Sequence, residues 1–247
     1  MDLQLIVITF FLFFIVSSLY SAVGHAGASG YIAIMALLSF APESIKPIAL
    51  ILNSVVALIA SVKFIKAGYF DKKIFYSFIF TSLPFAFIGG YITLNPVYFK
   101  IIAGIFLIIS AILLLVKTYI RRPNTEIKPI PIYLCLLIGV IIGLLSGLIG
   151  VGGGIFLSPI LILANWTSVK KASGIAALFI LCNSLAGLIG HLPNMQLIDK
   201  SLFLWLVAVV LGGFLGTYFG TKKFNNKVII GFLFLVLLSA GIKFILV

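Results

Sequence analysis

Long runs of hydrophobic residues make up most of the chain, and short breaks with charged residues, proline or asparagine separate them. We distinguish eight runs, at residues 3–41, 47–65, 74–94, 97–117, 130–165, 172–191, 201–221 and 228–246. Six of the eight have the length of about 20 residues with which a helix crosses a hydrocarbon core of about 30 Å. The pattern therefore predicts several membrane-spanning helices.

The two remaining runs, 3–41 and 130–165, are too long for one crossing. As straight helices they would extend over about 50 to 60 Å. Each contains a glycine cluster, from Gly24 to Gly30 in the first run and from Gly147 to Gly154 in the second. We expect each run to break at its cluster, as a re-entrant hairpin or as a pair of short helices. Such a break is stable within a bilayer only where protein or a water-filled cavity surrounds it.

Landmarks of the first half recur in the second half, beyond a polar connector in the middle of the chain. The offset stays between 126 and 130 residues for the pairs Gly24 and Gly150, Asn53 and Asn183, Asp71 and Asp199, Gly89 and Gly216, Lys100 and Lys227, and Gly104 and Gly231. Coincidence among glycine-rich helices is the alternative to an internal repeat. We favour the repeat, and predict a first membrane repeat at 1–118, a cytoplasmic linker at 119–130 and a second membrane repeat at 131–247.

Composition excludes a soluble globular protein. Hydrophobic residues make up 63% of the 247 residues and charged residues only 9%, against about 25% charged in soluble domains. Lipid must therefore replace water around the chain. The net charge of +12 lies in short basic clusters between apolar runs rather than in one patch with interleaved aromatics. We therefore expect the lipid bilayer, and not nucleic acid, as the partner of the basic residues.

The distribution of lysine and arginine predicts the topology. If each glycine-broken run makes zero or two crossings, four lysines lie on one side, Lys46, Lys100, Lys200 and Lys243. The other side then holds thirteen basic residues: Lys63, Lys66, Lys72, Lys73, Lys117, Arg121, Arg122, Lys128, Lys170, Lys171, Lys222, Lys223 and Lys227. One net crossing would give ten and seven. The positive-inside rule favours the uneven division. It predicts an all-α protein of the cell (inner) membrane, with both termini outside and two inverted repeats, each a glycine-broken segment followed by three transmembrane helices.

Inverted repeats with interrupted helices are typical of secondary transporters, whose site lies near the midplane. An interrupted helix exposes backbone N–H groups and the positive end of its dipole, which suits an anion, and glycine allows close approach. In the second half we expect the bend at Gly150 to Gly154 and a half-helix at Ile155 to Ala164, with Ser158 and Pro159 in its first turns. The alternative role of membrane glycines is close helix packing, which we expect for Gly89, Gly90, Gly212, Gly213 and Gly216.

The sequence Gly150-Val151-Gly152-Gly153-Gly154, followed by Pro159 and an apolar helix, resembles the signature of the sulfite exporter TauE/SafE family of membrane permeases. The resemblance covers essentially the whole chain. It implies a multi-pass transporter of small sulfur-containing anions, such as sulfite or organosulfonates. The first glycine cluster departs from the motif, because His25 and Ala26 interrupt it and Pro159 has no counterpart there.

The predicted spans carry almost no charged residues away from their ends, so a carboxylate proton relay or sodium site is not expected. Backbone N–H groups, hydroxyls and amides would hold the anion. His25, with an ordinary pKa near 6.5, could carry a coupling proton or help to neutralise the anion. Ordinary hydrogen bonding between helices, worth about 0.6 kcal/mol, is the alternative role of the polar residues. The candidate binding residues are Gly24, His25, Gly27, Ser29, Gly30, Asn53, Ser54, Gly150, Gly152, Gly153, Gly154, Ser158, Asn183 and Ser184.

The other titratable residues suggest structural roles. We expect His191 to be interfacial at the outer end of a span, Asp71 and Asp199 to cap helices, and Lys63 and Lys243 to snorkel. Cys135 and Cys182 form neither a disulfide framework nor a metal spacing.

We expect no catalytic residue, metal or cofactor, because two histidines and five acidic residues supply no metal cluster, nucleophile–base pair or paired carboxylates. An anion channel is the nearest alternative to a transporter. A membrane-embedded enzyme and a structural membrane protein are further alternatives, both less favoured.

Overall fold

The computed structural model describes residues 3–22, 24–119, 127–195, 200–220 and 226–246, whose regular structure is helical. The helices are α1 (Leu3–Ala22), α2 (Ala28–Leu37), α3 (Pro42–Lys66), α4 (Lys72–Tyr91), α5 (Pro96–Tyr119), α6 (Ile132–Ile149), α7 (Gly154–Leu163), α8 (Val169–His191), the short 3₁₀ helix η1 (Leu192–Asn194), α9 (Leu202–Gly220) and α10 (Asn226–Leu246). Of the described helices, six are long and apolar enough to cross a membrane. The all-α membrane fold is thereby confirmed.

Both over-long hydrophobic runs are broken at their glycines. Glycines with left-handed backbone mark each break: Gly24 (φ 81°) and Gly27 (φ 108°) between α1 and α2, and Gly150 (φ 93°), Gly152 (φ 74°) and Gly153 (φ 77°) between α6 and α7. Any other residue would be strained there by about 1–2 kcal/mol. Each run forms a long helix followed by a helix of 10 residues, which rises about 15 Å, half of a hydrocarbon core. The expectation of two short helices was therefore wrong for the first helix of each pair.

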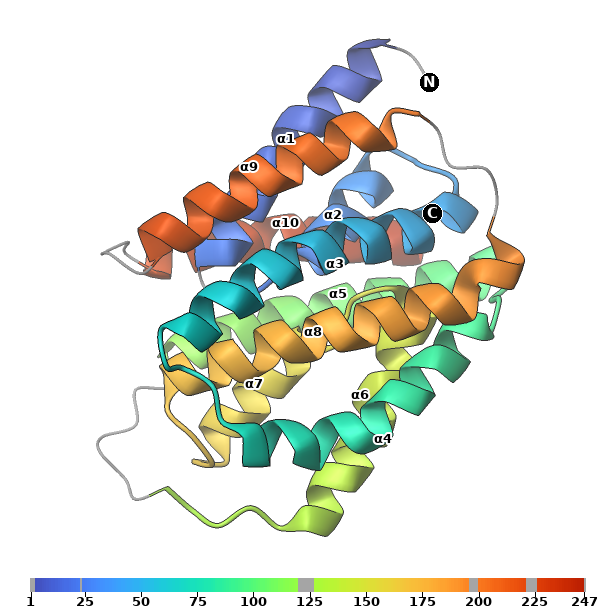
Figure 1. Ribbon diagram of the computed structural model, residues 1–247. Helices are drawn as coiled ribbons and strands as arrows, with labels where there is room; N and C mark the ends of the chain where they lie inside the picture. The colour runs from blue at the N-terminus through green and yellow to red at the C-terminus, as the bar shows by residue number, and fades with distance from the viewer. Residues whose placement is uncertain (1–2, 23, 120–126, 196–199, 221–225, 247) are drawn as a thin grey trace.

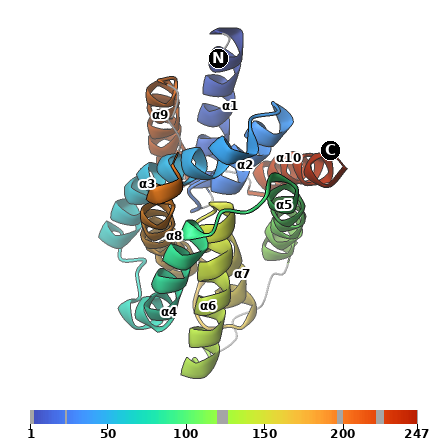
Figure 2. The ribbon, with the colours of Figure 1, turned by 90° about the vertical axis from the view of Figure 1, so that its right-hand side faces the viewer.

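Helices of one half pack mainly against helices of the other half. α3 lies along α8 and α5 along α10, while α1 pairs with α9 and α6 with α4. Figure 2 shows α1 and α9 at one extremity of the molecule and α4 and α6 at the other, with the remaining helices between them. The connections α3–α4 and α7–α8 lie at the left in Figure 1, and the start of α1, the connections α2–α3 and α4–α5 and the end of α10 lie toward the right.

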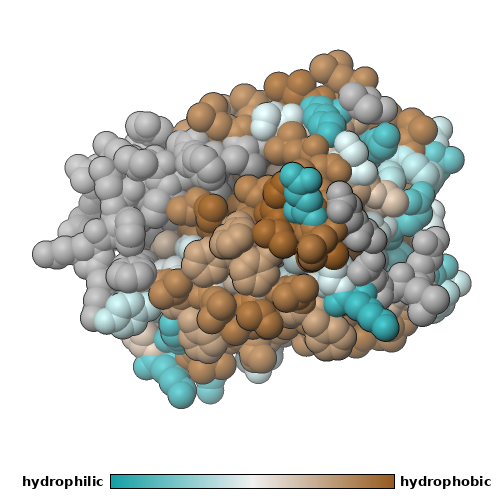
Figure 3. All heavy atoms as spheres, turned by 90° about the horizontal axis from the view of Figure 1, so that it is seen from above, coloured by the Kyte–Doolittle hydropathy of each residue, from teal (hydrophilic) through white to brown (hydrophobic). Residues whose placement is uncertain are grey.

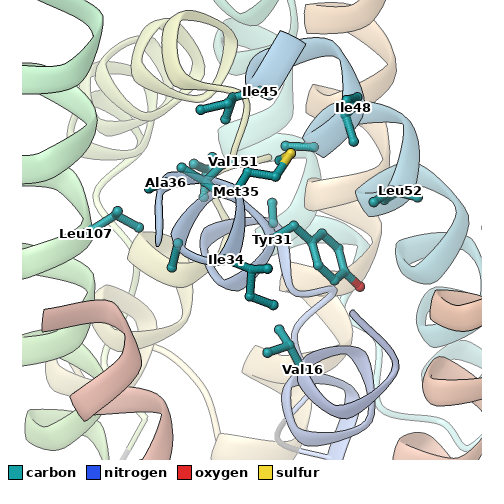
Figure 4. Packing of buried hydrophobic residues seen from close by; sticks show 14 of the residues in the cluster. Val16, Tyr31, Ile34, Met35, Ala36, Ile45, Ile48, Leu52, Leu107 and Val151 are labelled. Carbon is teal, nitrogen blue, oxygen red and sulfur yellow. The ribbon is translucent and has the colours of Figure 1, made fainter. Parts of the chain in front are cut away.

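The two short helices form the centres of the two hydrophobic clusters. In α2 every residue from 28 to 36 is buried. Figure 4 shows α2 enclosed by Val16 of α1, Ile45 of α3, Leu107 of α5 and Val151 of the second break. Around α7, Leu157 packs with residues of α4, α6 and α8. Protein therefore surrounds both breaks, as irregular backbone at membrane depth requires.

Large apolar side chains cover the outside of the helices. Phe80 of α4 is 81% exposed and Phe203 of α9 75% exposed. The face in Figure 3 shows a broad hydrophobic area, with most hydrophilic residues toward the right-hand side and a smaller group at the lower left. An apolar surface of this kind is rare on soluble monomers. It is the surface expected of helices in contact with lipid.

Several glycines allow helices to approach closely, as predicted. A Cβ atom on Gly89 would collide with the carbonyl oxygen of Leu144, one on Gly90 with that of Gly187, and one on Gly216 with that of Ser18. A Cβ on Gly212 would lie 2.5 Å from the carbonyl oxygen of Phe14. Gly213 is different, because the nearest atom to its Cβ position, on Val56, is 3.3 Å away. The packing role is confirmed for four of these glycines, while Gly213 has more room.

Candidate functional site

The second break ends one helix and begins another with three left-handed glycines. The N–H of Gly150 donates to the carbonyl of Ser146 (2.9 Å) and closes α6. Gly152 (φ 74°) and Gly153 (φ 77°) then turn the chain into α7. In the described part of the chain, no side chain accepts from the first N–H groups of α7. These groups and the positive end of the helix dipole form the kind of terminus that binds anions.

Gly152 faces two polar side chains. A Cβ at this position would lie 2.6 Å from Asn53 Nδ2 and 2.7 Å from Ser184 Oγ. Asn53 Nδ2 donates to Ser184 Oγ (2.8 Å) and to the carbonyl of Val151 (3.4 Å). Because Asn53 belongs to α3 and Ser184 to α8, the second break meets both α3 and α8 at this point.

Asn53 also reaches the first break. Its Oδ1 accepts from the N–H of Ala28, the first residue of α2 (3.1 Å), and its side chain is buried. The amide therefore bridges the two breaks, and it supplies the acceptor that the N-terminus of α2 needs. The N-terminus of α7 has no equivalent partner among the described side chains. The two breaks thus differ in their state of capping.

Two tyrosines that the sequence analysis did not select hold the first break. Tyr20 and Ser29 share a hydrogen bond (2.9 Å), and Tyr31 donates to the carbonyl of Ala26 (2.9 Å). His25, which lies between these tyrosines in the sequence, is also buried. A hydroxyl in an apolar run was the only sequence signal for these tyrosines. The three glycines of this break have no room for a side chain. A Cβ atom on Gly24 would lie 2.6 Å from Ser173 Cβ, one on Gly27 2.9 Å from Tyr31 Oη, and one on Gly30 2.8 Å from Tyr20 Cε2.

Asn183, the counterpart of Asn53, has a different environment. Its Oδ1 accepts from Ser82 Oγ of α4 (3.0 Å). Its Nδ2, the hydroxyl of Ser158 on α7 and the hydroxyl of Ser146 on α6 are buried, and none has a hydrogen-bond partner among the described residues. Ser146 Cβ is 3.6 Å from the position of a Cβ on Gly153. Unpaired buried polar groups cost about 1–3 kcal/mol each, so three of them in the helices around the second break indicate groups available to a ligand.

The structure brings together part of the candidate set. Gly152, Asn53 and Ser184 meet directly, and Gly150, Gly153 and Gly154 complete the same break. Ser54 is apart from this contact, because its hydroxyl donates to the carbonyl of Leu50 in its own helix (2.8 Å). Ser146 is a residue that sequence reasoning missed, since one serine in an apolar run carries no distinguishing signal.

Two basic residues are largely buried. Lys46, which the sequence places among the loop residues of the sparsely charged side, belongs to α3 and is only 5% exposed. His191 ends α8 as expected, and neighbouring residues bury its side chain. α3 begins at Pro42, before the apolar run 47–65, because proline is favoured in the first turn of a helix.

The structural roles expected of other residues are partly confirmed. Asp71 Oδ1 accepts from the N–H of Ile74 (3.2 Å) and caps α4, whereas Asp199 lies outside the described residues. Lys63 Nζ donates to Thr217 Oγ1 (2.6 Å), and Lys243 Nζ donates to the carbonyl of Leu37 (2.8 Å). In the described ranges, no three His, Cys, Asp or Glu side chains gather where they could hold a metal ion.

Known proteins resemble the chain over most of its length. The family model "Sulfite exporter TauE/SafE" matches residues 9–244. The probable membrane transporter protein y4hK of Sinorhizobium fredii is 35% identical over 94% of each chain. The probable membrane transporter protein YunE of Bacillus subtilis is 25% identical over 76% of this chain and 75% of its own length. The probable membrane transporter protein MJ0441 of Methanocaldococcus jannaschii is 40% identical over 115 residues, 45% of this chain and 42% of its own.

No solved structure matches the chain. The match of the family model extends from α1 to α10 and includes both glycine breaks. The chain therefore belongs to the sulfite exporter TauE/SafE family of membrane transporters.

Proposed function

We propose that the protein carries small anions across the cell membrane, with sulfite and organosulfonates as the substrate class. The observation that carries this proposal is the uncapped N-terminus of α7 behind three left-handed glycines. The first N–H groups of α7 have no side-chain acceptor in the described part of the chain. A buried donor without an acceptor is costly, and an anion is a suitable acceptor. The name of the family supports sulfite as the first substrate to test.

The proposed binding site consists of the N–H groups from Gly152 to Gly154, the hydroxyl of Ser158 and the amides around them. Asn183 Nδ2 and Ser158 Oγ are buried donors without partners in the described part. They would complete the coordination of an oxyanion, because a hydroxyl and an amide donate as a backbone N–H does. The proposed site requires no buried cation.

We further propose that the two halves, 1–118 and 131–247, are inverted repeats joined by a cytoplasmic linker at 119–130. Their packing supports this, because α1–α9 matches α6–α4 and α2–α10 matches α7–α5. The positive-inside rule then assigns the end of the molecule that holds the α3–α4 connection to the cytoplasm, and both termini to the outside.

The difference between the breaks suggests how access alternates. In this structure Asn53 caps α2 while α7 is open. In the opposite state of an inverted repeat, the halves would exchange these roles: Asn183 would leave Ser82 and cap α7, and the break of Gly24 to Gly30 with His25 and Ser29 would open. The anion and Asn183 would thus compete for the same N–H groups.

Transport by purified protein in liposomes tests the proposal. The measurement is uptake of sulfite, sulfate, an organosulfonate and a carboxylate, with and without a pH gradient. We expect selective uptake of the sulfur oxyanions and acceleration by internal substrate, which is the counterflow of a carrier. Uptake equal to that of empty vesicles would refute transport, and selective uptake without counterflow would indicate a channel.

A further inference from the structure

A hollow of about 80 Å³ lies at the end of the molecule that holds the α2–α3 and α4–α5 connections. Residues of several elements line it, among them Lys46 of α3, Thr93 of the α4–α5 connection, Leu148 of α6, His191 of α8 and Asn194 of η1. A water molecule needs about 10–15 Å³ by the same kind of measure. The hollow therefore has room for a small oxyanion such as sulfite.

The ammonium of Lys46 is the principal charge at this hollow. It donates to the carbonyls of Gly89 (3.2 Å), Gly90 (2.8 Å) and Ile92 (3.1 Å) at the end of α4. The negative end of the helix dipole offsets part of the charge. Among the described residues no carboxylate pairs with Lys46. A nearly buried cation without a counter-ion attracts an anion.

His191 is adjacent to Lys46 and shares one of its acceptors. His191 Nδ1 is 3.3 Å from the carbonyl oxygen of Gly90, and Asn194 Nδ2 donates to the carbonyl of Tyr91 (2.9 Å). When Nδ1 holds the proton for this contact, protonation of Nε2 adds a second donor and a second positive charge. Glu43 is the single acidic residue of the lining. Protonated His191 therefore gives the hollow a net positive charge.

The hollow adjoins the second break. Leu148 lines it in the last turn of α6, and a Cβ on Gly150 would lie 3.1 Å from the carbonyl oxygen of Lys46. A second hollow of about 200 Å³, lined by Lys100 and Lys243, shares Pro42 with the first. Positively charged clefts with apolar walls concentrate anions.

We propose that the hollow of Lys46 and His191 is an entry site, where the transported oxyanion binds before it reaches the N-terminus of α7. The inference rests on the proposed function. Lys46 supplies the ammonium group at the hollow, and His191 strengthens binding when it is protonated. The same anion would then leave the cationic site for the neutral donors of the break.

A steric variant tests the entry site without removing the contacts of Lys46. Thr93 is exposed and lines the hollow, so Thr93→Trp would fill it. Val97→Trp is the matched control, since Val97 is 61% exposed and lies outside the lining. We expect Thr93→Trp to raise the half-saturating sulfite concentration about tenfold in vesicle uptake, with little change for Val97→Trp. Equal half-saturation in both variants would overturn the inference.

A charge variant provides the second measurement. His191→Leu keeps the three carbonyl contacts of Lys46, and Lys200→Gln removes a charge from the same side of the molecule away from the lining. We measure equilibrium binding of sulfite to the purified protein, with chloride as the control anion, at pH 5 and pH 6, where most of the sulfite is the monoanion at both values. His191→Leu should abolish the tighter binding at pH 5, and Lys200→Gln should retain it. An unchanged pH dependence in His191→Leu would contradict the entry site.

The outcomes separate the two proposals. Suppose that Thr93→Trp takes up sulfite normally, while glycine variants of the second break lose uptake. This result would support the transport function and refute the entry site. Sulfite binding that depends on Thr93 and His191, in a protein without uptake, would support the anion site and refute transport.

Discussion

Asn53 and Asn183 share the local sequence Asn-Ser, yet they make different hydrogen bonds. Asn53 bridges Ala28 and Ser184, and Asn183 accepts from Ser82 while its Nδ2 remains unpaired in the described part. We predict that Asn53→Leu lowers the free energy of unfolding by about 2–4 kcal/mol, because it leaves buried partners unsatisfied. Asn183→Leu should lower the free energy of unfolding clearly less, because it also removes the unpaired Nδ2 group of Asn183.

Unfolding midpoints of the two variants in the same detergent provide the comparison. Equal losses, or a larger loss for Asn183→Leu, would contradict the assigned hydrogen bonds.

The sequence predicted both asparagines as site residues but could not separate their roles. Their neighbours in the chain are alike, and the distinction comes from the residues that face them, Ala28 in one case and Ser82 in the other. Lys46 was misplaced for a related reason. Its charge placed it just before the apolar run 47–65, while Pro42 in the first helical turn was the signal that α3 already includes it.

At the scale of elements, contact between α4 and α8 depends on glycine. We predict that Gly90→Ala destabilises the protein by about 1–3 kcal/mol, because its Cβ would meet the carbonyl oxygen of Gly187 and force the helices apart. Gly213→Ala is the control, with its nearest neighbour 3.3 Å away. The side chain of Val56 has to shift by only a few tenths of an ångström, so Gly213→Ala should lose clearly less stability than Gly90→Ala.

Thermal unfolding of both variants in detergent checks the prediction. A Gly90→Ala protein as stable as Gly213→Ala would show that α4 and α8 are not in backbone contact at this point.

Breaks in the two long runs could be predicted, because a run of 39 or 36 residues exceeds the membrane and glycine marks the weak point. The length of each part could not. α1 and α6 keep 20 and 18 residues, and only α2 and α7 are short. Helices that are apolar on all sides present no amphipathic face, so the sequence did not show that α2 would be enclosed completely.

At the scale of the whole molecule, inversion of the halves has a direct consequence. Lys72 is the first residue of α4, and Lys200 lies just before α9, at corresponding positions of the proposed repeats. In a background with Cys135 and Cys182 replaced, Lys72→Cys should react with an impermeant maleimide only from the cytoplasmic side, and Lys200→Cys only from the outside. Labelling of both from one side would refute the inverted repeat.

Outside the two broken runs, the approximate positions of the spans could be predicted from hydropathy, because a helix needs about 20 apolar residues to cross the hydrocarbon core. The partners of each helix could not. Hydropathy does not distinguish the α9 face that meets α1 from one that meets lipid, whereas close contacts such as Gly212 with Phe14 depend on shape.

The claim that the glycine-formed N-terminus of α7 binds the transported anion is tested most directly by one pair of alanine variants. Gly152 and Gly68 both have left-handed backbone, at φ 74° and φ 75°. A Cβ on Gly152 would meet Asn53 and Ser184, whereas nothing lies within 4 Å of one on Gly68. Both variants carry the same backbone strain of about 1–2 kcal/mol.

Sulfite uptake into liposomes, normalised to the amount of folded protein, is the measurement. We predict that Gly152→Ala lowers the uptake rate at least tenfold and that Gly68→Ala retains the rate of the unmodified protein. A folded Gly152→Ala protein with undiminished uptake would contradict anion binding at this break.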